Sequence, residues 1–254
     1  MRPSGKWIAE WNGDVTTAVQ AYTNAAQNDG KLPVLIAYNI PNRDCGSYSA
    51  GGIGGGDAYK SWISSFASAI GNRPAIVVLE PDALMQLDCL KTDADRTARL
   101  SLLNYALDQF AAKAPNTWVY VDAGHSNWKT AEETATRLIN AGIAKARGFA
   151  LNVSNYRATS ELVSHGNAIN AQLQSQAGFQ RTFVIDTSRN GNGPLGSEWC
   201  DPAGRKIGVV TQFHTIGSGL ELSLWLKIPG EADGCAGGAG QFLPDLAVRL
   251  INGN

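Results

Sequence analysis

Acidic side chains follow several short apolar runs of this sequence. Glu80 and Asp82 come directly after the run 75–79, Asp122 ends a second run, and Asp44 lies shortly beyond a third. Crowded carboxylates raise one another's pKa, so one of them stays protonated near neutral pH and can act as a general acid. A paired acid and base with aromatic rings alongside is the machinery that glycoside hydrolysis requires.

Later apolar runs end in residues suited to binding sugars. Asn, Lys and Arg side chains bind hydroxyl groups, and the tryptophans Trp7, Trp128 and Trp199 offer flat apolar surfaces for stacking. Filling the core is the alternative role for any one of these tryptophans. The polar residues at these ends are His125, Asn152, Asn155, Asp186, Arg189, Lys227, Glu231 and Asp233.

Other acids have simpler interpretations. Asp14 and Asp57 stand where helix N-caps are expected, and Asp201 before a proline is typical of a turn. Asp186 fits a loop anchor as well as a site residue. The acids that remain at or just beyond predicted strand ends are Asp44, Asp82, Asp122 and Asp233.

Seven apolar runs predict the strands that position these residues. Most are almost continuously apolar, as expected for parallel strands covered on both faces. The predicted strands are 6–11, 33–40, 75–81, 118–124, 148–154, 181–188 and 223–230.

Helical periodicity separates the predicted strands. Helices are expected from Asp14 to Gly30 and from Asp57 to Gly71, and Thr130 with Glu133 forms a capping box for a third. This alternation predicts an α/β fold with a parallel sheet, and seven strands with polar ends favour a barrel. The glycine-rich segment 51–56 lacks the Lys-Ser/Thr of a phosphate loop and is interpreted as a flexible loop over a cleft.

Composition limits the possible functions. The chain has 254 residues, and 21 Lys and Arg against 22 Asp and Glu give a net charge of −1, which argues against nucleic-acid or membrane-surface partners. No apolar run reaches the roughly 20 residues of a membrane span. Without a Pro/Ser/Thr-rich linker, residues 1–254 are predicted to form one domain.

Four cysteines and three histidines argue against a structural zinc site, because no Cys-x-x-Cys pair is present. We expect no metal and no cofactor. Two disulfides, which imply an oxidising compartment, are the simplest use of the cysteines. Four buried thiols in a cytosolic enzyme are the alternative.

Several motifs together resemble glycoside hydrolase family 6, the inverting cellulases. They occur in order over nearly the whole chain: YNIPNRDCG (38–46), VVLEPDAL (77–84), VYVDAGHSNW (119–128), NVSNYR (152–157), DTSRNGNGP (186–194), EWCDPAGR (198–205) and LWLKIPGEADGC (224–235). The resemblance implies a distorted seven-stranded parallel (β/α) barrel, similar to a TIM barrel, that acts as a glycoside hydrolase catalytic domain. The family usually has a further helical segment before the first strand, so the N-terminal segment here is short by comparison.

The same resemblance implies roles for individual residues. Asp82 would protonate the departing glycosidic oxygen, and Asp44 would influence its proton affinity and help to handle the attacking water. Tyr38 would lie beneath the reacting sugar. Asp233 would be the base, or a water relay to Asp44 would replace it. Ser49, or alternatively Ser47, would be the water-handling serine unless the register places an alanine there.

Substrate-contacting positions are implied at Trp7, Asp122, His125, Trp128, Asn155, Trp199, Lys227 and Glu231. The family pairs its cysteines in chain order, which implies the disulfides Cys45–Cys89 and Cys200–Cys235. On the chain-entropy model each would stabilise the fold by about 4 kcal/mol.

The expected activity is endo-acting hydrolysis of β-1,4-glucan. The span from Cys200 to Cys235 is short, and the segment after Asp233, GCAGGAGQF, leaves no room for a loop that roofs the cleft. Cellulose and cello-oligosaccharides are the expected partners of a secreted monomer. The alternatives are a cellobiohydrolase of the same family, an inactive carbohydrate-binding barrel, and a metal-assisted hydrolase or deacetylase using Asp122 and His125.

Overall fold

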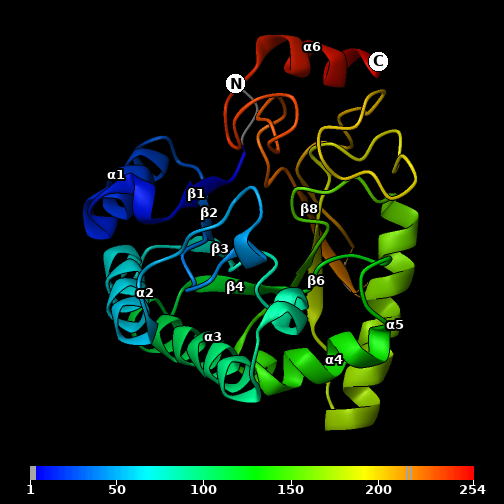
Figure 1. The fold of residues 1–254 in the computed structure, drawn as a ribbon. Helices are drawn as coiled ribbons and strands as arrows, with labels where there is room; N and C mark the ends of the chain where they lie inside the picture. The colour runs from blue at the N-terminus through cyan, green and yellow to red at the C-terminus, as the bar shows by residue number, and fades with distance from the viewer. Residues whose placement is uncertain (1–3, 216, 218) are drawn as a thin grey trace. The chain divides into compact units, whose positions relative to one another are not determined.

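A computed structural model describes residues 4–215, 217 and 219–254 of the chain. Helices and strands alternate over residues 6–186, and within the described residues eight strands form a sheet in the order β1-β2-β3-β4-β5-β6-β8-β7 (Figure 1). The predicted α/β class with a parallel sheet is confirmed. Seven strands were expected, and the eighth is β7, a two-residue strand antiparallel to β8.

The strands are β1 (Lys6–Ile8), β2 (Val34–Ala37), β3 (Ala75–Leu79), β4 (Thr117–Asp122), β5 (Gly148–Leu151), β6 (Thr182–Asp186), β7 (Gln212–Phe213) and β8 (Leu220–Leu224). The helices are α1 (Val15–Asn28), α2 (Gly56–Ile70), α3 (Asp93–Lys113), α4 (Ala131–Asn140), α5 (Thr159–Ala177) and α6 (Pro244–Asn252). Short 3₁₀ helices are η1 (Glu10–Asn12), η2 (Asp44–Gly46), η3 (Met85–Cys89) and η4 (Ile143–Lys145). None of the described helices is both long and apolar enough to cross a bilayer.

The chain divides into two compact units, each described by itself. The N-terminal unit comprises Lys6–Ala123 and Thr136–Phe149. The C-terminal unit comprises 4–5, Gly124–Ala135 and Ala150–Asn254.

Parallel strands β1 to β4 organise the N-terminal unit. Their register places Ile8, Ala37, Leu79 and Val121 side by side across the sheet. All five residues of β3 are buried, as expected for a strand covered on both faces. The polar residues that follow these four positions therefore emerge together at one edge of the sheet.

Helix α2 packs against both α1 and α3 in the same unit (Figure 1). The predicted apolar face of α2 is buried, including Tyr59, Ile63 and Phe66. Burying each such side chain contributes about 1.5–3 kcal/mol.

Several predicted boundaries in this unit are wrong, among them the strand 33–40, which ends at Ala37. Strand β1 ends at Ile8, because the chain then turns into the 3₁₀ helix η1, and the predicted strand 6–11 is too long. Asp14 caps α1 as predicted, with its carboxylate accepting from the Thr17 N–H at 2.8 Å. Asp57 does not cap α2, because the helix begins at Gly56 and its cap position is Gly55.

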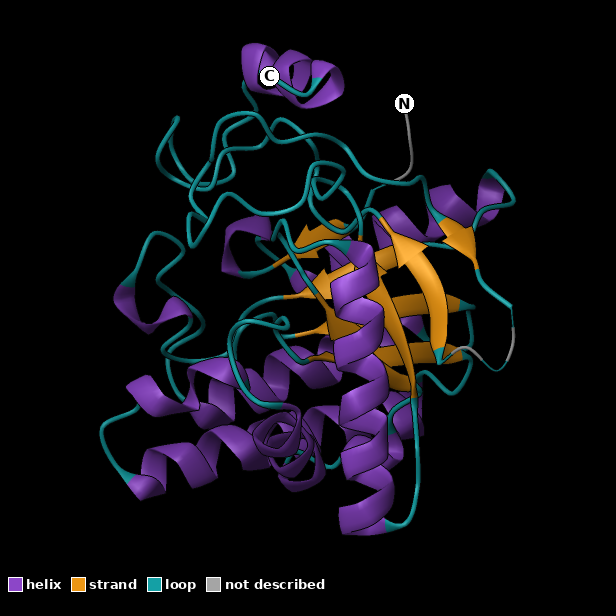
Figure 2. Cartoon of the chain, turned by 90° about the vertical axis from the view of Figure 1, so that its right-hand side faces the viewer, coloured by secondary structure: helices purple, strands orange, loops and turns teal. Residues whose placement is uncertain are grey.

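Strands β6 and β8 pair in parallel in the C-terminal unit, and β7 closes their free edge. The last predicted strand, 223–230, is wrong in position, because β8 covers Leu220–Leu224. Its ladder stops there for a physical reason: the N–H groups of Leu226 and Lys227 donate to the Asp186 carboxylate at 3.2 Å. Loops without helix or strand connect β6 to β7 (Figure 2).

Gly166 in α5 provides a test of packing in this unit. A Cβ atom there would lie 2.6 Å from the Cζ atom of Phe183, which is fully buried in β6. In an open helix position Gly→Ala stabilises by about 1 kcal/mol. Because overpacking opposes that gain, we expect Gly166→Ala to destabilise by about 1–3 kcal/mol in denaturant unfolding. Ser175→Ala on the exposed part of the same helix is the control, and a stabilised Gly166→Ala would contradict the packing argument.

Candidate active site

Polar residues in the N-terminal unit gather where the parallel strands end. The register continues past the strands, so Tyr38, Glu80 and Asp122 are neighbours: the N–H of Tyr38 donates to the Ile8 carbonyl at 3.0 Å and that of Glu80 to Ala37 at 2.8 Å. Backbone φ angles are positive at Glu80 (48°), Asp82 (68°) and Asp44 (56°). Such conformations cost about 1–3 kcal/mol each and persist only where surrounding contacts enforce them.

Asp82 lies among other carboxylates. Its backbone N–H donates to Oδ2 of Asp122 at 2.9 Å, which ties the loop after β3 to the end of β4. Burial and the nearby charges of Asp122 and Asp44 raise the pKa of Asp82 well above its ordinary value. The surroundings therefore favour the protonated carboxyl, which can donate a proton.

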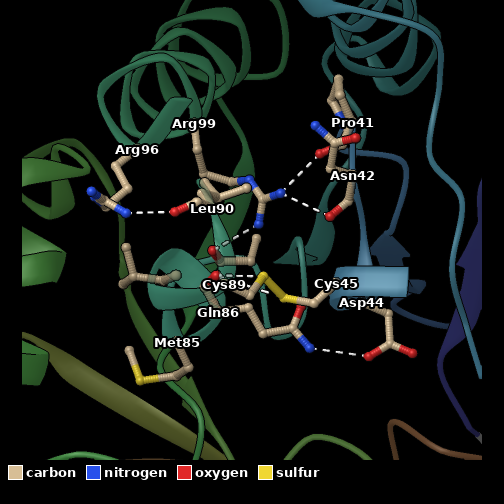
Figure 3. Close-up of a disulfide and its surroundings, with 12 residues drawn as sticks. Pro41, Asn42, Asp44, Cys45, Met85, Gln86, Cys89, Leu90, Arg96 and Arg99 are labelled. Carbon is tan, nitrogen blue, oxygen red and sulfur yellow. Dashed lines mark hydrogen bonds between the residues drawn. A yellow bond between two sulfur atoms is a disulfide. The ribbon is translucent and has the colours of Figure 1, made fainter. Parts of the chain in front are cut away.

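The carboxylate of Asp44 is held by two donors. Oδ2 accepts from the backbone N–H of Ser49 at 2.7 Å, and Oδ1 accepts from Nε2 of Gln86 at 3.0 Å (Figure 3). The disulfide Cys45–Cys89 joins the next residue to the segment that carries Gln86, with a Cα–Cα distance of 6.0 Å. This pairing is the one that the resemblance implied.

A buried arginine connects the loop that precedes Asp44 to the loop that carries Asp82. The Arg99 guanidinium from α3 donates to the carbonyls of Pro41 and Asn42, each at 2.9 Å, and to Ala83 at 3.2 Å (Figure 3). A single side chain therefore links the loop before Asp44 to the residue after Asp82.

Glu80 is a buried anchor rather than a catalytic group. Its carboxylate accepts from the N–H groups of Asn39, at 2.9 and 3.1 Å, and Ile40, at 3.0 Å. Burial raises the pKa of Glu80 to about 7, although these N–H donors and Arg43 oppose the shift. The contacts fix the turn that follows Tyr38.

Aromatic rings border the acids. The ring of Trp7 meets Tyr38 edge-on at a centroid distance of 5.0 Å, and the Arg43 guanidinium lies 4.5 Å from the centre of the Tyr38 ring. Arg43 is buried and pairs with Glu10 at 2.9 Å. Burial, with the charges of Asp82 and Asp44, raises the pKa of Tyr38, so its hydroxyl stays neutral.

Asp233 in the C-terminal unit is tightly held. Its Oδ2 accepts from Arg189 Nη1 at 2.9 Å, from the Tyr156 hydroxyl at 3.1 Å and from the backbone N–H of Asp201 at 3.2 Å. Lys227 Nζ lies 3.7 Å from the other oxygen. These contacts fix the carboxylate in one orientation.

The sequence profile of the glycosyl hydrolases family 6 matches residues 1–245. The chain belongs to this family.

Two individual endoglucanases are similar to this family 6 chain over almost its whole length. It is 49% identical to endoglucanase 1 of Streptomyces halstedii, over 99% of this chain and 78% of that protein. It is 45% identical to endoglucanase A of Thermobispora bispora, over 98% of this chain but only 54% of that protein, so it spans about half the length of that relative.

Solved structures also match the family 6 chain. The endoglucanase Cel6 of Mycobacterium tuberculosis, in complex with methyl-cellobiosyl-4-deoxy-4-thio-β-D-cellobioside, superposes with a TM-score of 0.93 and 42% identity, covering 99% of this chain and 87% of that one. The family 6 enzyme of Orpinomyces sp. Y102 superposes with a TM-score of 0.86 and 27% identity over 99% and 86% of the two chains.

The predicted site residues of this family 6 protein divide between the units. The N-terminal unit brings together Trp7, Tyr38, Asp44, Ser49, Asp82 and Asp122. The C-terminal unit holds His125, Trp128, Asn155, Trp199, Lys227, Glu231 and Asp233.

Several members of the second group lie close to one another. The rings of His125 and Trp128 lie 5.4 Å apart, and Lys227 faces Asp233 and Glu231. Burial and the Arg157 charge lower the pKa of His125 to about 4, so its imidazole is neutral. Trp199 is about half exposed, and the Asn155 side chain accepts from the next residue's N–H at 2.8 Å.

Sequence reasoning missed the residue that fixes the Asp233 loop. The Asp201 carboxylate accepts from the N–H groups of Asp233 (2.8 Å), Cys235 (3.1 Å) and Ala236 (2.9 Å), beside the predicted disulfide Cys200–Cys235. Asp201 was interpreted only as a turn former. Its position next to Cys200 was the available signal, since the expected cysteine pairing brings it to the Asp233 segment.

Gln86 and Arg99 were also missed, because neutral amides and helix arginines are ordinary surface residues by type.

The prediction that Asp186 is a loop anchor is confirmed. It is fully buried and accepts from the backbone N–H groups of Ser154 and Ser188 at 2.9 Å, in addition to those after β8.

The raised pKa of Glu80 predicts that the free energy of unfolding depends on pH. Since burial raises this pKa from 4.5 to about 7, the folded family 6 protein binds more protons than the unfolded chain between those values. Glu80 therefore lowers stability as pH rises from about 4.5 to about 7, by about 3 kcal/mol in total. We expect Glu80→Gln to remove that pH-dependent loss.

Free energies of unfolding at pH 4.5 and pH 7.5 test this. The variant is less stable at pH 4.5, because the amide cannot accept all the backbone donors, and the difference from wild type shrinks at pH 7.5. Glu198→Gln, on an exposed residue, is the control. A difference that stays constant with pH would contradict the assignment.

Proposed function

We propose that this family 6 chain hydrolyses internal β-1,4-glucosidic bonds of cellulose and related β-glucans with inversion at the anomeric carbon. The observation that carries the proposal is Asp82, whose pKa is raised by burial and by the charges of Asp122 and Asp44. A proton donor with neighbouring carboxylates is what inverting hydrolysis requires.

Asp82 acts as the general acid. It protonates the departing glycosidic oxygen as the bond to the anomeric carbon breaks, and water attacks the opposite face of the sugar. The backbone contact to Asp122 supports this role because it fixes the loop on which the acid lies.

Asp44 and Ser49 handle the attacking water. The hydrogen bond from the Ser49 N–H to Asp44 supports these roles, because it orients the carboxylate beside Tyr38 and Asp82. Asp233 remains the alternative base. Its engagement by Arg189, Tyr156 and Asp201 favours relay of the proton through water to Asp44, since those contacts already occupy one oxygen.

Trp7 and Tyr38 bind and distort the reacting sugar. Asp122, His125, Trp128, Asn155, Trp199, Lys227 and Glu231 contact the rest of the glucan chain. The glucan-type ligand of the Mycobacterium tuberculosis relative supports a cello-oligosaccharide as substrate. The two disulfides support an enzyme that acts outside the cell, and we expect it to be a monomer and one catalytic domain.

Loss of Asp82 tests the acid role. Because general acid catalysis contributes roughly 10²–10⁴-fold, Asp82→Ala loses about that much kcat on cellohexaose. The same variant keeps most of its activity on a 2,4-dinitrophenyl cello-oligosaccharide, since that leaving group departs without a proton. Asp93→Ala, on an exposed residue, is the control.

Proton NMR of fresh wild-type product from cellohexaose tests the stereochemistry in parallel. Initial α-anomer supports inversion. Initial β-anomer, or an Asp82→Ala variant that loses both substrates equally, would refute this mechanism. Binding without any product would favour an inactive carbohydrate-binding barrel.

Endo action is favoured over exo action by the comparisons. Relatives at 41–49% identity are named endoglucanases, and those named cellobiohydrolases are 30–31% identical. Viscosity of carboxymethylcellulose should therefore fall much faster than soluble reducing sugar appears. Parallel release of mainly cellobiose would show a cellobiohydrolase.

A further inference from the structure

Gln86 contacts both acidic residues of the proposed mechanism, Asp82 through the backbone and Asp44 through the side chain. It lies in η3, one turn after Asp82, and its backbone N–H donates to the Asp82 carbonyl at 2.8 Å. Its side chain reaches the other way, so that Nε2 donates to Oδ1 of Asp44 at 3.0 Å (Figure 3).

The direction of this hydrogen bond follows from the chemistry of the two groups. An ionised carboxylate only accepts hydrogen bonds, so the amide nitrogen of Gln86 must face Asp44. With Ser49 donating to Oδ2 at 2.7 Å, each oxygen of Asp44 has one neutral donor. Donors to the charged form favour ionisation over protonation.

The segment that carries Gln86 is rigidly held. The Cys45–Cys89 disulfide closes it against η2, and Arg99 donates to the Ala83 carbonyl at 3.2 Å. Arg137 from α4 donates to the carbonyls of Leu84 at 3.0 Å and Met85 at 2.9 Å. The amide therefore meets Asp44 from a fixed backbone, which reduces the conformational entropy lost in making the contact.

We propose that Gln86 is a positioning residue that keeps Asp44 ionised and thereby sets the acid limit of activity. This inference rests on the proposed function, in which Asp44 must be ionised and Asp82 protonated.

Ionisable groups of the N-terminal unit surround this pair. Tyr38 stays neutral, Arg43 is paired with Glu10, and the charges of Asp122 and Asp44 both raise the pKa of Asp82. Protonation removes the charge of Asp82, so hydrogen-bond donors are left to stabilise the charge of Asp44. One of these is a donor on Oδ1. Gln86 supplies it without adding a charge that would lower the proton affinity of Asp82.

Two substitutions separate the hydrogen bond from packing. Gln86→Met keeps the length of the side chain but removes the donor, and Gln86→Glu keeps the shape but places a carboxylate against Asp44. We measure kcat/KM on cellohexaose from pH 3.5 to pH 9.

Gln86→Met should move the acid limb upward by about one pH unit and leave the alkaline limb in place. Activity at a pH on that limb then falls up to tenfold. Gln86→Glu should move both limbs upward, because its negative charge favours protonation of Asp44 and of Asp82 alike.

Asp88→Asn is the matched control. Asp88 lies on the same 3₁₀ helix but pairs with Arg137 at 2.5 Å instead of contacting Asp44. If Gln86 only stabilised the segment, this control would shift the acid limb as much as Gln86→Met does. That result, or unshifted limbs in both Gln86 variants, would overturn the inference.

A second readout does not depend on activity. In protein labelled with ¹³C at the aspartate carboxyls, the Asp44 signal, assigned with Asp44→Asn, should titrate about one pH unit higher in Gln86→Met than in wild type. An unchanged midpoint would overturn the role of Gln86. Wild-type enzyme that hydrolyses without inversion would instead refute the proposed function, whatever the titration shows.

Discussion

Carboxylates that accept backbone N–H groups, most of them buried, hold the strand ends and loops of this protein in place. In the N-terminal unit, Glu80 binds the turn after β2, and Asp122 binds the loop after β3. In the C-terminal unit, Asp186 binds the chain after β8, and Asp201 binds the segment from Asp233 onward. Each anchor connects a loop to a neighbouring strand or loop, so the reacting groups have little freedom. Because N–H donors would otherwise be buried without partners, replacing an anchor costs more than one hydrogen bond.

In the proposed mechanism the same kind of side chain, a buried carboxyl, serves both as anchor and as general acid, and its surroundings decide which. Glu80 accepts from two backbone N–H groups, which oppose the effect of burial on its pKa. For Asp82 burial is reinforced by the charges of Asp122 and Asp44, and its pKa rises well above the ordinary value. Asp122, which anchors the loop after β3, therefore also provides negative charge that favours the protonated form of Asp82. This dual use explains why so many carboxylates are tolerated at one sheet edge.

In both units a disulfide and hydrogen bonds from a charged side chain constrain the same loops. The Cys45–Cys89 bridge lies beside the Arg99 contacts, and the Cys200–Cys235 bridge lies beside the Asp201 carboxylate. Positive φ angles at Asp44 and Asp82 show that the loops are held in costly conformations. Such conformations need several independent contacts, because one hydrogen bond is worth only about 1 kcal/mol.

The sequence by itself determined the α/β class and most strand positions, because these follow from local apolar runs. Its motifs carried the resemblance to family 6, and that resemblance implied both disulfide pairs. The sequence did not determine where β8 ends, since Asp186, which captures the N–H groups after Leu224, is about 40 residues away in the chain. Nor did it show the roles of Gln86 and Asp201. Only the tertiary structure decided those, because a side chain's role as donor or anchor depends on the partner that folding brings to it.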